Sequence, residues 1–145
     1  MNTAPGSKAL SPAINDPTTA VQSLDQIEDL LLRLGQCHLD TGRYRDSDGK
    51  VRLLVPFPTW EDFLRLAFAE ISSCGATSVQ VMRRMNALVA DLTLAVPEER
   101  RSTLQYWDRR LKATIARSFT DGEERVEASE EDRQGLGIPR QHSSG

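Results

Sequence analysis

The residues best suited to chemistry lie in the segment KALSPAINDP, at positions 8–17. Ser11 offers a hydroxyl, Asn15 an amide and Asp16 a carboxylate, so the segment could bind a small ligand or an ion. It also has the composition of a boundary between two helices. Ser11, which precedes a proline, ends one helix, and Asp16 can cap the next, whose first residue is Pro17. The local sequence favours this structural interpretation.

Outside this segment, no set of side chains predicts catalysis or metal binding. Cys37 and His38 are neighbours, but adjacent helical residues point about 100° apart and do not form a nucleophile pair. Asp25, Glu28 and Asp29 could bind a cation together, and a solvated helix face is the interpretation we favour. The sequence carries no nucleotide-binding, nucleophile-elbow or zinc motif. We therefore expect no enzyme activity, no metal ion and no cofactor.

The distribution of charge argues against nucleic acid as a partner. The 145 residues carry a formal net charge of −3 at pH 7. Residues 121–134 hold a dense run of acidic residues, which is typical of a solvated acidic tail. Arg109 and Arg110 stand beside Tyr106 and Trp107, a combination that could contact nucleic acid, but the acidic chain as a whole disfavours it.

No segment of the sequence predicts export or insertion into a membrane. The first residues lack the basic start and apolar run of a signal peptide, and no apolar run reaches the ~18–20 residues that cross a bilayer. The two cysteines, Cys37 and Cys74, are not spaced as metal ligands, and we expect both to be reduced thiols. We expect the isolated chain to be cytoplasmic.

Four helices are predicted to position these residues. Apolar residues recur every three or four positions over residues 17–39, 59–75, 77–96 and 98–119. Thr59 and Thr77 are the predicted caps of the second and third helices. Trp60 and Trp107 lie on the apolar faces, so we expect both in the core.

A turn signal at Ser47-Asp48-Gly49 predicts a short hairpin between the first two helices. Because a lone hairpin is marginal in water, we expect it to lean on the helices. The predicted fold is mainly α, a small bundle or array of about four helices with one short β-hairpin. We expect residues 1–7 to be disordered, 8–120 to form the helical domain, and 121–145 to be an acidic, mostly flexible tail.

Several strings along the chain resemble one known family. These are ALSPAINDP, RDSDGKVRLLVPFPTWEDFLRLAFAEI, CGATSVQVMRRMNAL, VPEERR and, at positions 132–137, DRQGLG. In this order they are similar to the soluble C-terminal region of the family called domain of unknown function 2254, a set of predicted bacterial membrane proteins. The resemblance implies membrane association, several membrane-spanning helices ahead of this region, and no established catalytic residues. This sequence lacks those helices, so we expect a truncated product or a stand-alone relative.

Two functions stay open from the sequence. The first is a non-enzymatic helical module that assembles or regulates a membrane-embedded partner or associates with itself. The second is a domain that senses a small ligand or an ion, with the ligand-binding candidates Ser11, Asn15, Asp16, Arg133 and Gln134. If the tail folds back, Arg133 and Asp16 would meet as a charged pair.

Overall fold

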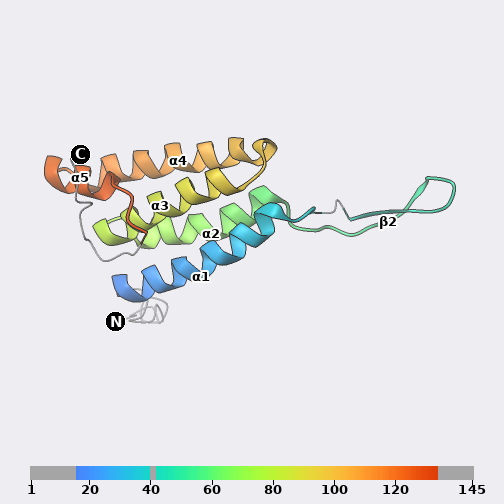
Figure 1. The fold of residues 1–145 in the computed structure, drawn as a ribbon, viewed down its shortest axis with the longest axis horizontal. Coiled ribbons are helices and arrows are strands. Elements are labelled where there is room, and N and C mark those ends of the chain that lie inside the picture. Colours follow the sequence, from blue (N-terminus) through green and yellow to red (C-terminus); the bar gives the residue numbers. More distant parts are fainter. Residues whose placement is uncertain (1–15, 40–41, 134–145) are drawn as a thin grey trace, which may run out of the picture.

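The computed structural model describes residues 16–39 and 42–133 and is mainly helical (Figure 1). The described residues form five helices and two strands, joined by turns and loops. In chain order they are α1 (Pro17–Gln36), β1 (Arg43–Arg45), β2 (Val51–Leu54), α2 (Trp60–Cys74), α3 (Val79–Ala95), α4 (Glu98–Ser118) and α5 (Gly122–Ser129). The predicted fold class, mainly α with one short hairpin, is confirmed. Residues 1–7 and the other residues outside the two ranges lie beyond what the structure describes.

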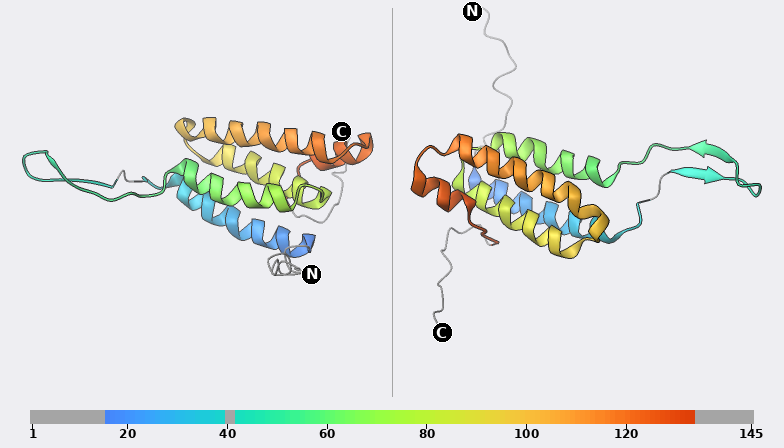
Figure 2. Two further views of the ribbon diagram at one scale, coloured as in Figure 1. Left: turned by 180° about the vertical axis from the view of Figure 1, so that it is seen from behind. Right: turned by 90° about the horizontal axis from the view of Figure 1, so that it is seen from above.

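The four long helices alternate in direction along a common axis (Figure 1). Helix α3 is the central element, because it packs against α1, α4 and α5. Helix α2 completes the bundle by contacting both α1 and α4. One end of the bundle therefore carries the start of α1 and all of α5, and the hairpin leaves from the other end (Figure 2).

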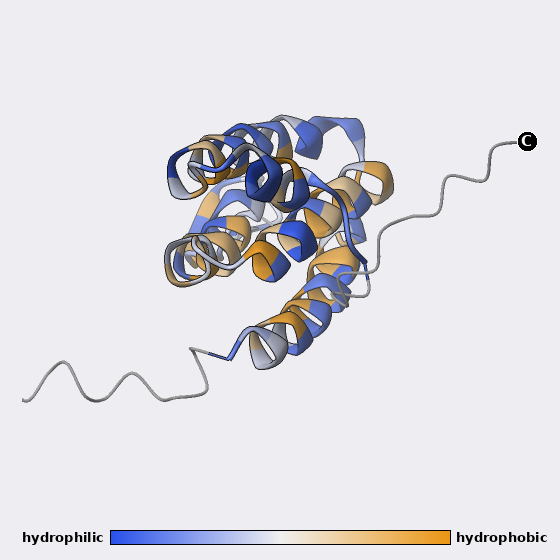
Figure 3. Ribbon diagram, turned by 90° about the vertical axis from the view of Figure 1, so that its left-hand side faces the viewer, coloured by the Kyte–Doolittle hydropathy of each residue, from blue (hydrophilic) through white to orange (hydrophobic). Residues whose placement is uncertain are grey.

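The predicted apolar faces meet in one core. Trp60 and Trp107 are both buried, as expected, and the ring of Trp107 lies 5.4 Å from that of Phe68. Seen from the end that carries α5, the helices bear apolar and hydrophilic residues on different faces (Figure 3). Fully buried side chains come from each long helix and include Leu24, Leu64, Phe68, Met82, Met85, Leu88, Leu92, Leu104 and Ile115.

The helices begin where capping residues predict. The carboxylate of Asp16 accepts a hydrogen bond from the Thr18 backbone N–H at 3.2 Å, which confirms Asp16 as the cap of α1. Thr59 and Asp62 form a reciprocal capping box at the start of α2. The cap of α3 is Ser78 instead of the predicted Thr77, since it is the Ser78 hydroxyl that accepts from the backbone N–H of Val81.

Helix α1 ends at Gln36, three residues earlier than the pattern predicted. The guanidinium of Arg100, at the start of α4, donates to the backbone carbonyls of Leu34, Gly35 and Cys37 at 2.8–2.9 Å. The last carbonyls of a helix lack donors from a following turn, and Arg100 supplies donors to them here; the Leu34 carbonyl also accepts from the Cys37 backbone N–H. Arg100 also lies 5.6 Å from the centre of the Trp60 ring. One arginine thus joins the end of α1 to the starts of α2 and α4.

The hairpin is correctly predicted, but its expected contact with the helices is not found. All seven residues of β1 and β2 are exposed, and the hairpin projects away from the bundle (Figure 2). Its local order comes from the turn, where the Asp46 carboxylate accepts from the backbone N–H of Asp48 and Lys50 and from Arg52. Gly49, at φ +76°, supplies the left-handed residue of this turn.

The acidic segment after α4 differs from the flexible tail that its composition suggested. Asp121 caps α5, and Ala128 on that helix is fully buried. The carbonyl of Ala128 accepts from Asn86 of α3 at 2.9 Å, and the backbone N–H of Asp132 donates to the carbonyl of Arg83. The segment to Arg133 is therefore packed on α3, since its backbone has hydrogen-bond partners there.

Candidate functional site

Two of the five ligand-binding candidates fall within the described residues. Ser11, Asn15 and Gln134 lie outside them. The Asp16 carboxylate serves as the cap of α1 and also accepts from the Thr19 hydroxyl at 2.7 Å. These hydrogen bonds, first the one from the Thr19 side chain, hold the pKa of Asp16 below its ordinary value.

The expected charged pair between Arg133 and Asp16 does not form. The Nε and Nη2 groups of Arg133 instead donate hydrogen bonds to the carboxylate of Asp91 in α3, with N–O distances of 2.6–3.0 Å. The hydrogen bonds to Asp91 raise the pKa of Arg133 above its ordinary value. The tail does fold back, as the hypothesis required, but onto the middle of α3 and not onto the start of α1. The structure thus gives Asp16 and Arg133 separate structural roles.

The acidic cluster on α1 is occupied by an arginine. Arg84 of α3 is buried, and its Nε donates to Asp25 at 2.7 Å while its Nη2 donates to Glu28. Burial works to lower the pKa of Arg84, but the hydrogen bonds to Glu28 and Asp25 outweigh it and raise the pKa. The favoured solvated face is therefore wrong for Glu28, which is largely buried against Arg84, whereas Asp25 pairs with Arg84 and stays about half exposed.

A second buried arginine precedes the first and faces the C-terminal segment. Arg83 lies 3.3 Å from Glu127, 3.4 Å from Glu130 and 3.9 Å from Asp132. Sequence reasoning missed both arginines, although a signal was present. Arg84 follows Val81 by three positions and precedes Leu88 by four, so it lies on the apolar face of its helix. A charged residue there requires a buried partner.

These charges serve packing between the helices. A shallow, open depression of about 510 Å³ lies between α4 and α5 and includes Glu130 in its lining. No group of three or more His, Cys, Asp or Glu within residues 16–39 and 42–133 could hold a metal ion. Both cysteines are free and exposed.

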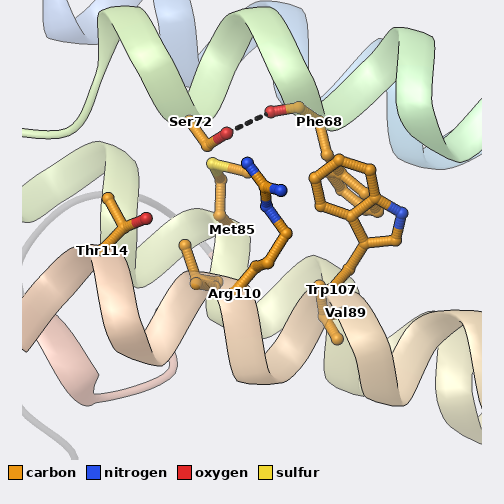
Figure 4. Close-up of a pocket in the computed structure, with 8 residues that line it drawn as sticks. Phe68, Ser72, Met85, Val89, Trp107, Arg110 and Thr114 are labelled. Carbon is orange, nitrogen blue, oxygen red and sulfur yellow. Dashed lines mark hydrogen bonds between the residues drawn. The ribbon is translucent and has the colours of Figure 1, made fainter.

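Figure 4 shows the cavity between α2, α3 and α4, where Arg110 extends beside Trp107, 5.5 Å from its ring centre. The cavity has a volume of about 10 Å³, no more than one water needs. It is lined by Phe68, Ser72, Met85, Val89, Trp107, Arg110, Leu111 and Thr114.

Residues 42–58, called the arm below, carry apolar side chains that the helical bundle does not cover. Leu53, Leu54 and Phe57 expose 54%, 65% and 53% of their surface, and Tyr44 and Val51 are also exposed. A shallow groove of about 440 Å³ continues this surface at the base of the arm. It is lined by Pro56, Phe57, Pro58, Asp62, Phe63, Arg65 and Leu66. Clustered apolar side chains of this kind mark binding sites on soluble domains.

A sequence signal for the arm existed in the run VRLLVPFP. A half-buried strand alternates apolar and polar residues, whereas Leu53 and Leu54 are adjacent and point to opposite faces of β2. Such a strand needs cover on both faces. Because the bundle covers neither face, the arm is the candidate interaction site.

Comparison with known proteins relates the chain to one family. The family model described as "Predicted membrane protein (DUF2254)" matches residues 6–91, which is more than half of the chain. The uncharacterized proteins Rv1290c and MT1328 of Mycobacterium tuberculosis and Mb1321c of Mycobacterium bovis are each 27% identical to it over 120 residues. The match covers 82% of this chain and 23% of each relative, so the chain spans about a quarter of their length. No solved structure matches.

A helix that crosses a bilayer is about 20 residues long and predominantly apolar. Among the described residues, no helix is both long and apolar enough for this.

Proposed function

This chain belongs to the DUF2254 family of predicted membrane proteins, and we propose that within such a protein it acts as a non-enzymatic module for assembly. The bundle is the rigid body of this module, and the arm is its binding element. The match to about a quarter of each relative supports a part that works beside other segments.

The use of the charged side chains favours binding over chemistry. Arg83, Arg84 and Arg100 each bond to a neighbouring element, and each fills a position where an uncompensated charge or carbonyl would be costly. A catalytic group must keep its reacting atom accessible to substrate. These side chains are instead committed to holding the helices together.

The observation that carries the proposal is the exposure of the arm. A two-stranded hairpin has little stability of its own. This hairpin projects beyond the bundle (Figure 2), its turn is held by Asp46, and its Leu53 and Leu54 side chains are exposed. A chain that only needed to connect α1 to α2 could do so with a short polar loop. The length and apolar content of the arm are better explained by a partner that covers it.

The proposal is tested by whether the arm binds hydrophobic ligands or other copies of the chain in solution. The wild-type chain should enhance the fluorescence of a hydrophobic dye, or form oligomers by size-exclusion chromatography with light scattering. A Leu53→Ser/Leu54→Ser variant should lose either property while keeping its helical circular dichroism. The matched control, Leu30→Ser/Val126→Ser, removes two exposed apolar side chains from α1 and α5 and should behave as the wild type.

A wild-type chain that is monomeric and binds no dye contradicts the proposal. Equal loss of dye binding in both double variants also contradicts it, because the signal would then come from the bundle.

A further inference from the structure

We propose that the arm binds the surface of an anionic lipid bilayer and lies in the headgroup region. This inference rests on the proposed function, because it names the partner of the same arm. Its support comes from the charge of the arm, from the placement of the apolar side chains and from the polarity of the turn.

The charge of the arm is opposite in sign to that of the whole chain. The chain has a net charge of −3, whereas the arm has more cationic than acidic residues. The acidic residues stand at the turn, where Asp46 is neutralised by Arg52 at 2.6 Å. The cationic side chains are Arg43, Arg45, Lys50 and Arg52. A cationic and apolar segment is attracted by anionic headgroups and buries its apolar side chains at the same surface.

The charge also argues against a second arm as the partner. Two arms laid side by side in a symmetric dimer would bring their cations together, which is unfavourable. An anionic surface has no such conflict.

The apolar side chains lie on both faces of the arm. In the register of the two strands, Tyr44 pairs with Leu53 and Arg43 pairs with Leu54. Leu53 and Leu54 therefore point to opposite sides, because neighbouring strand residues alternate. A folded protein surface would cover one side and leave the other in water. The fluid headgroup region can surround the arm and cover both.

The turn and the free strand edges limit how deep the arm can go. Asp46, Ser47 and Asp48 stand at the tip, so an approach by the tip would bring carboxylates to the lipid first. Each strand of a two-stranded hairpin also leaves one edge of backbone groups unpaired, and these cannot enter the hydrocarbon. An arm lying along the surface keeps these groups in water. Tyr44 is of a residue type enriched at this depth, and Phe57 suits the apolar side of a segment that lies there.

The experiment is co-sedimentation of the full chain with lipid vesicles. One set contains phosphatidylcholine alone, and the other contains equal amounts of phosphatidylcholine and phosphatidylglycerol. The wild-type chain should bind the anionic vesicles about 25-fold more tightly, because each of two net charges contributes about fivefold. Raising the salt concentration should weaken this binding.

Two variants and their controls separate the arm from the rest of the surface. Arg43→Gln/Lys50→Gln should weaken binding to the anionic vesicles about 25-fold, since two cations are removed. Arg101→Gln/Arg109→Gln removes two exposed cations from α4 and should leave binding unchanged. Leu53→Ser/Leu54→Ser should abolish binding.

Several results would overturn the inference. They are no vesicle binding, equal binding to neutral and anionic vesicles, or equal loss in the α4 control. Thermal unfolding of each variant verifies that the bundle is intact. A chain that shows arm-dependent dye binding or oligomers but no vesicle binding would overturn the lipid partner and leave the assembly role standing.

Discussion

At the scale of single residues, two adjacent arginines hold two different elements against α3. Neighbouring helical residues point about 100° apart, so Arg84 reaches α1 while Arg83 reaches the C-terminal segment. Within the described residues, Nε of Arg83 and Nη1 of Arg84 are buried without a hydrogen-bond partner. Burying a guanidinium that is not fully satisfied costs free energy. These two pairs therefore add less to the stability of the fold than fully hydrogen-bonded guanidinium groups would.

Replacing Arg84 alone should destabilise the protein strongly. Arg84→Met leaves Glu28 nearly buried and without its partner, and we expect a loss of about 3 kcal/mol in the free energy of unfolding. That value is at the low end for a broken buried pair, because Asp25 is half exposed. The double variant Arg84→Met/Glu28→Met removes both charges and should be the more stable of the two. Urea unfolding followed by circular dichroism measures both losses, and a double variant no more stable than Arg84→Met would refute this account.

The sequence predicts the core residues better than it predicts the charged pairs. Val81, Met82, Leu88 and the other apolar residues of α3 are recognisable because periodicity is local. The partner of Arg84 lies 56 positions away at Glu28, and no local pattern encodes that pairing. The ligand-binding candidates come from two strings at opposite ends of the chain, ALSPAINDP and DRQGLG, and the two candidates that the structure describes, Asp16 and Arg133, have structural partners instead.

At the scale of elements, the junction at the base of the arm depends on a close approach of α1. A Cβ atom at Gly35 would lie 2.7 Å from Cγ1 of Val96 and 3.4 Å from the Trp60 ring. Helix propensity alone predicts that Gly35→Ala stabilises α1 by about 1 kcal/mol. The structure predicts the opposite sign.

We expect Gly35→Ala to lower the free energy of unfolding by about 1 kcal/mol, since overpacking costs more than propensity returns. Combining it with Val96→Ala, which removes the clashing atom, should give a loss smaller than the sum of the two single variants. Thermal or urea unfolding of the four proteins measures this coupling. Strictly additive losses would show that Val96 is not the obstacle.

The capping box of α2 should make stability depend on acid pH. Hydrogen bonds from the Thr59 backbone N–H and hydroxyl hold the pKa of Asp62 below its ordinary value. A carboxyl with a depressed pKa stabilises the fold above its unfolded pKa of about 4, and this contribution is lost as the pH falls through the lower folded value. The melting temperature of Asp62→Ala should therefore lie below that of the wild type at neutral pH and approach it below about pH 4. A difference between the two proteins that persists in strong acid would contradict this.

The sequence predicts most of the caps and the hairpin turn correctly because their signals are local. It does not predict which elements pack against each other. The caps Asp16 and Thr59 and the turn at Asp48-Gly49 were all identified correctly. The expected contact between the hairpin and the helices was inferred from stability, and the sequence cannot say whether cover comes from the same bundle or from a partner. Helix α5 was missed because its acidic composition hides a helix with a single buried residue, Ala128.

At the scale of the whole molecule, the two ends of the bundle differ in how well their apolar side chains are covered. The arm end exposes apolar side chains, whereas the opposite end is closed by residues 121–133, which pack on α3 and α4. Composition alone assigns the closing segment to a solvated tail, because no local pattern in the sequence pairs that segment with Arg83 of α3. The segment thus belongs to the fold that positions the arm.

Removing the C-terminal segment should therefore weaken the entire bundle. A chain ending at Thr120 loses Ala128 from the core together with the three carboxylates that pair with Arg83, so we expect a lower free energy of unfolding than for a chain ending at Arg133. Arg133→Ala in the longer chain removes only a half-exposed pair and should cost less than about 1 kcal/mol. Comparing the urea midpoints of the three proteins distinguishes a closing segment from a flexible tail. Equal midpoints for the two truncated chains would mean that α5 and the residues after it do not pack against α3 in solution.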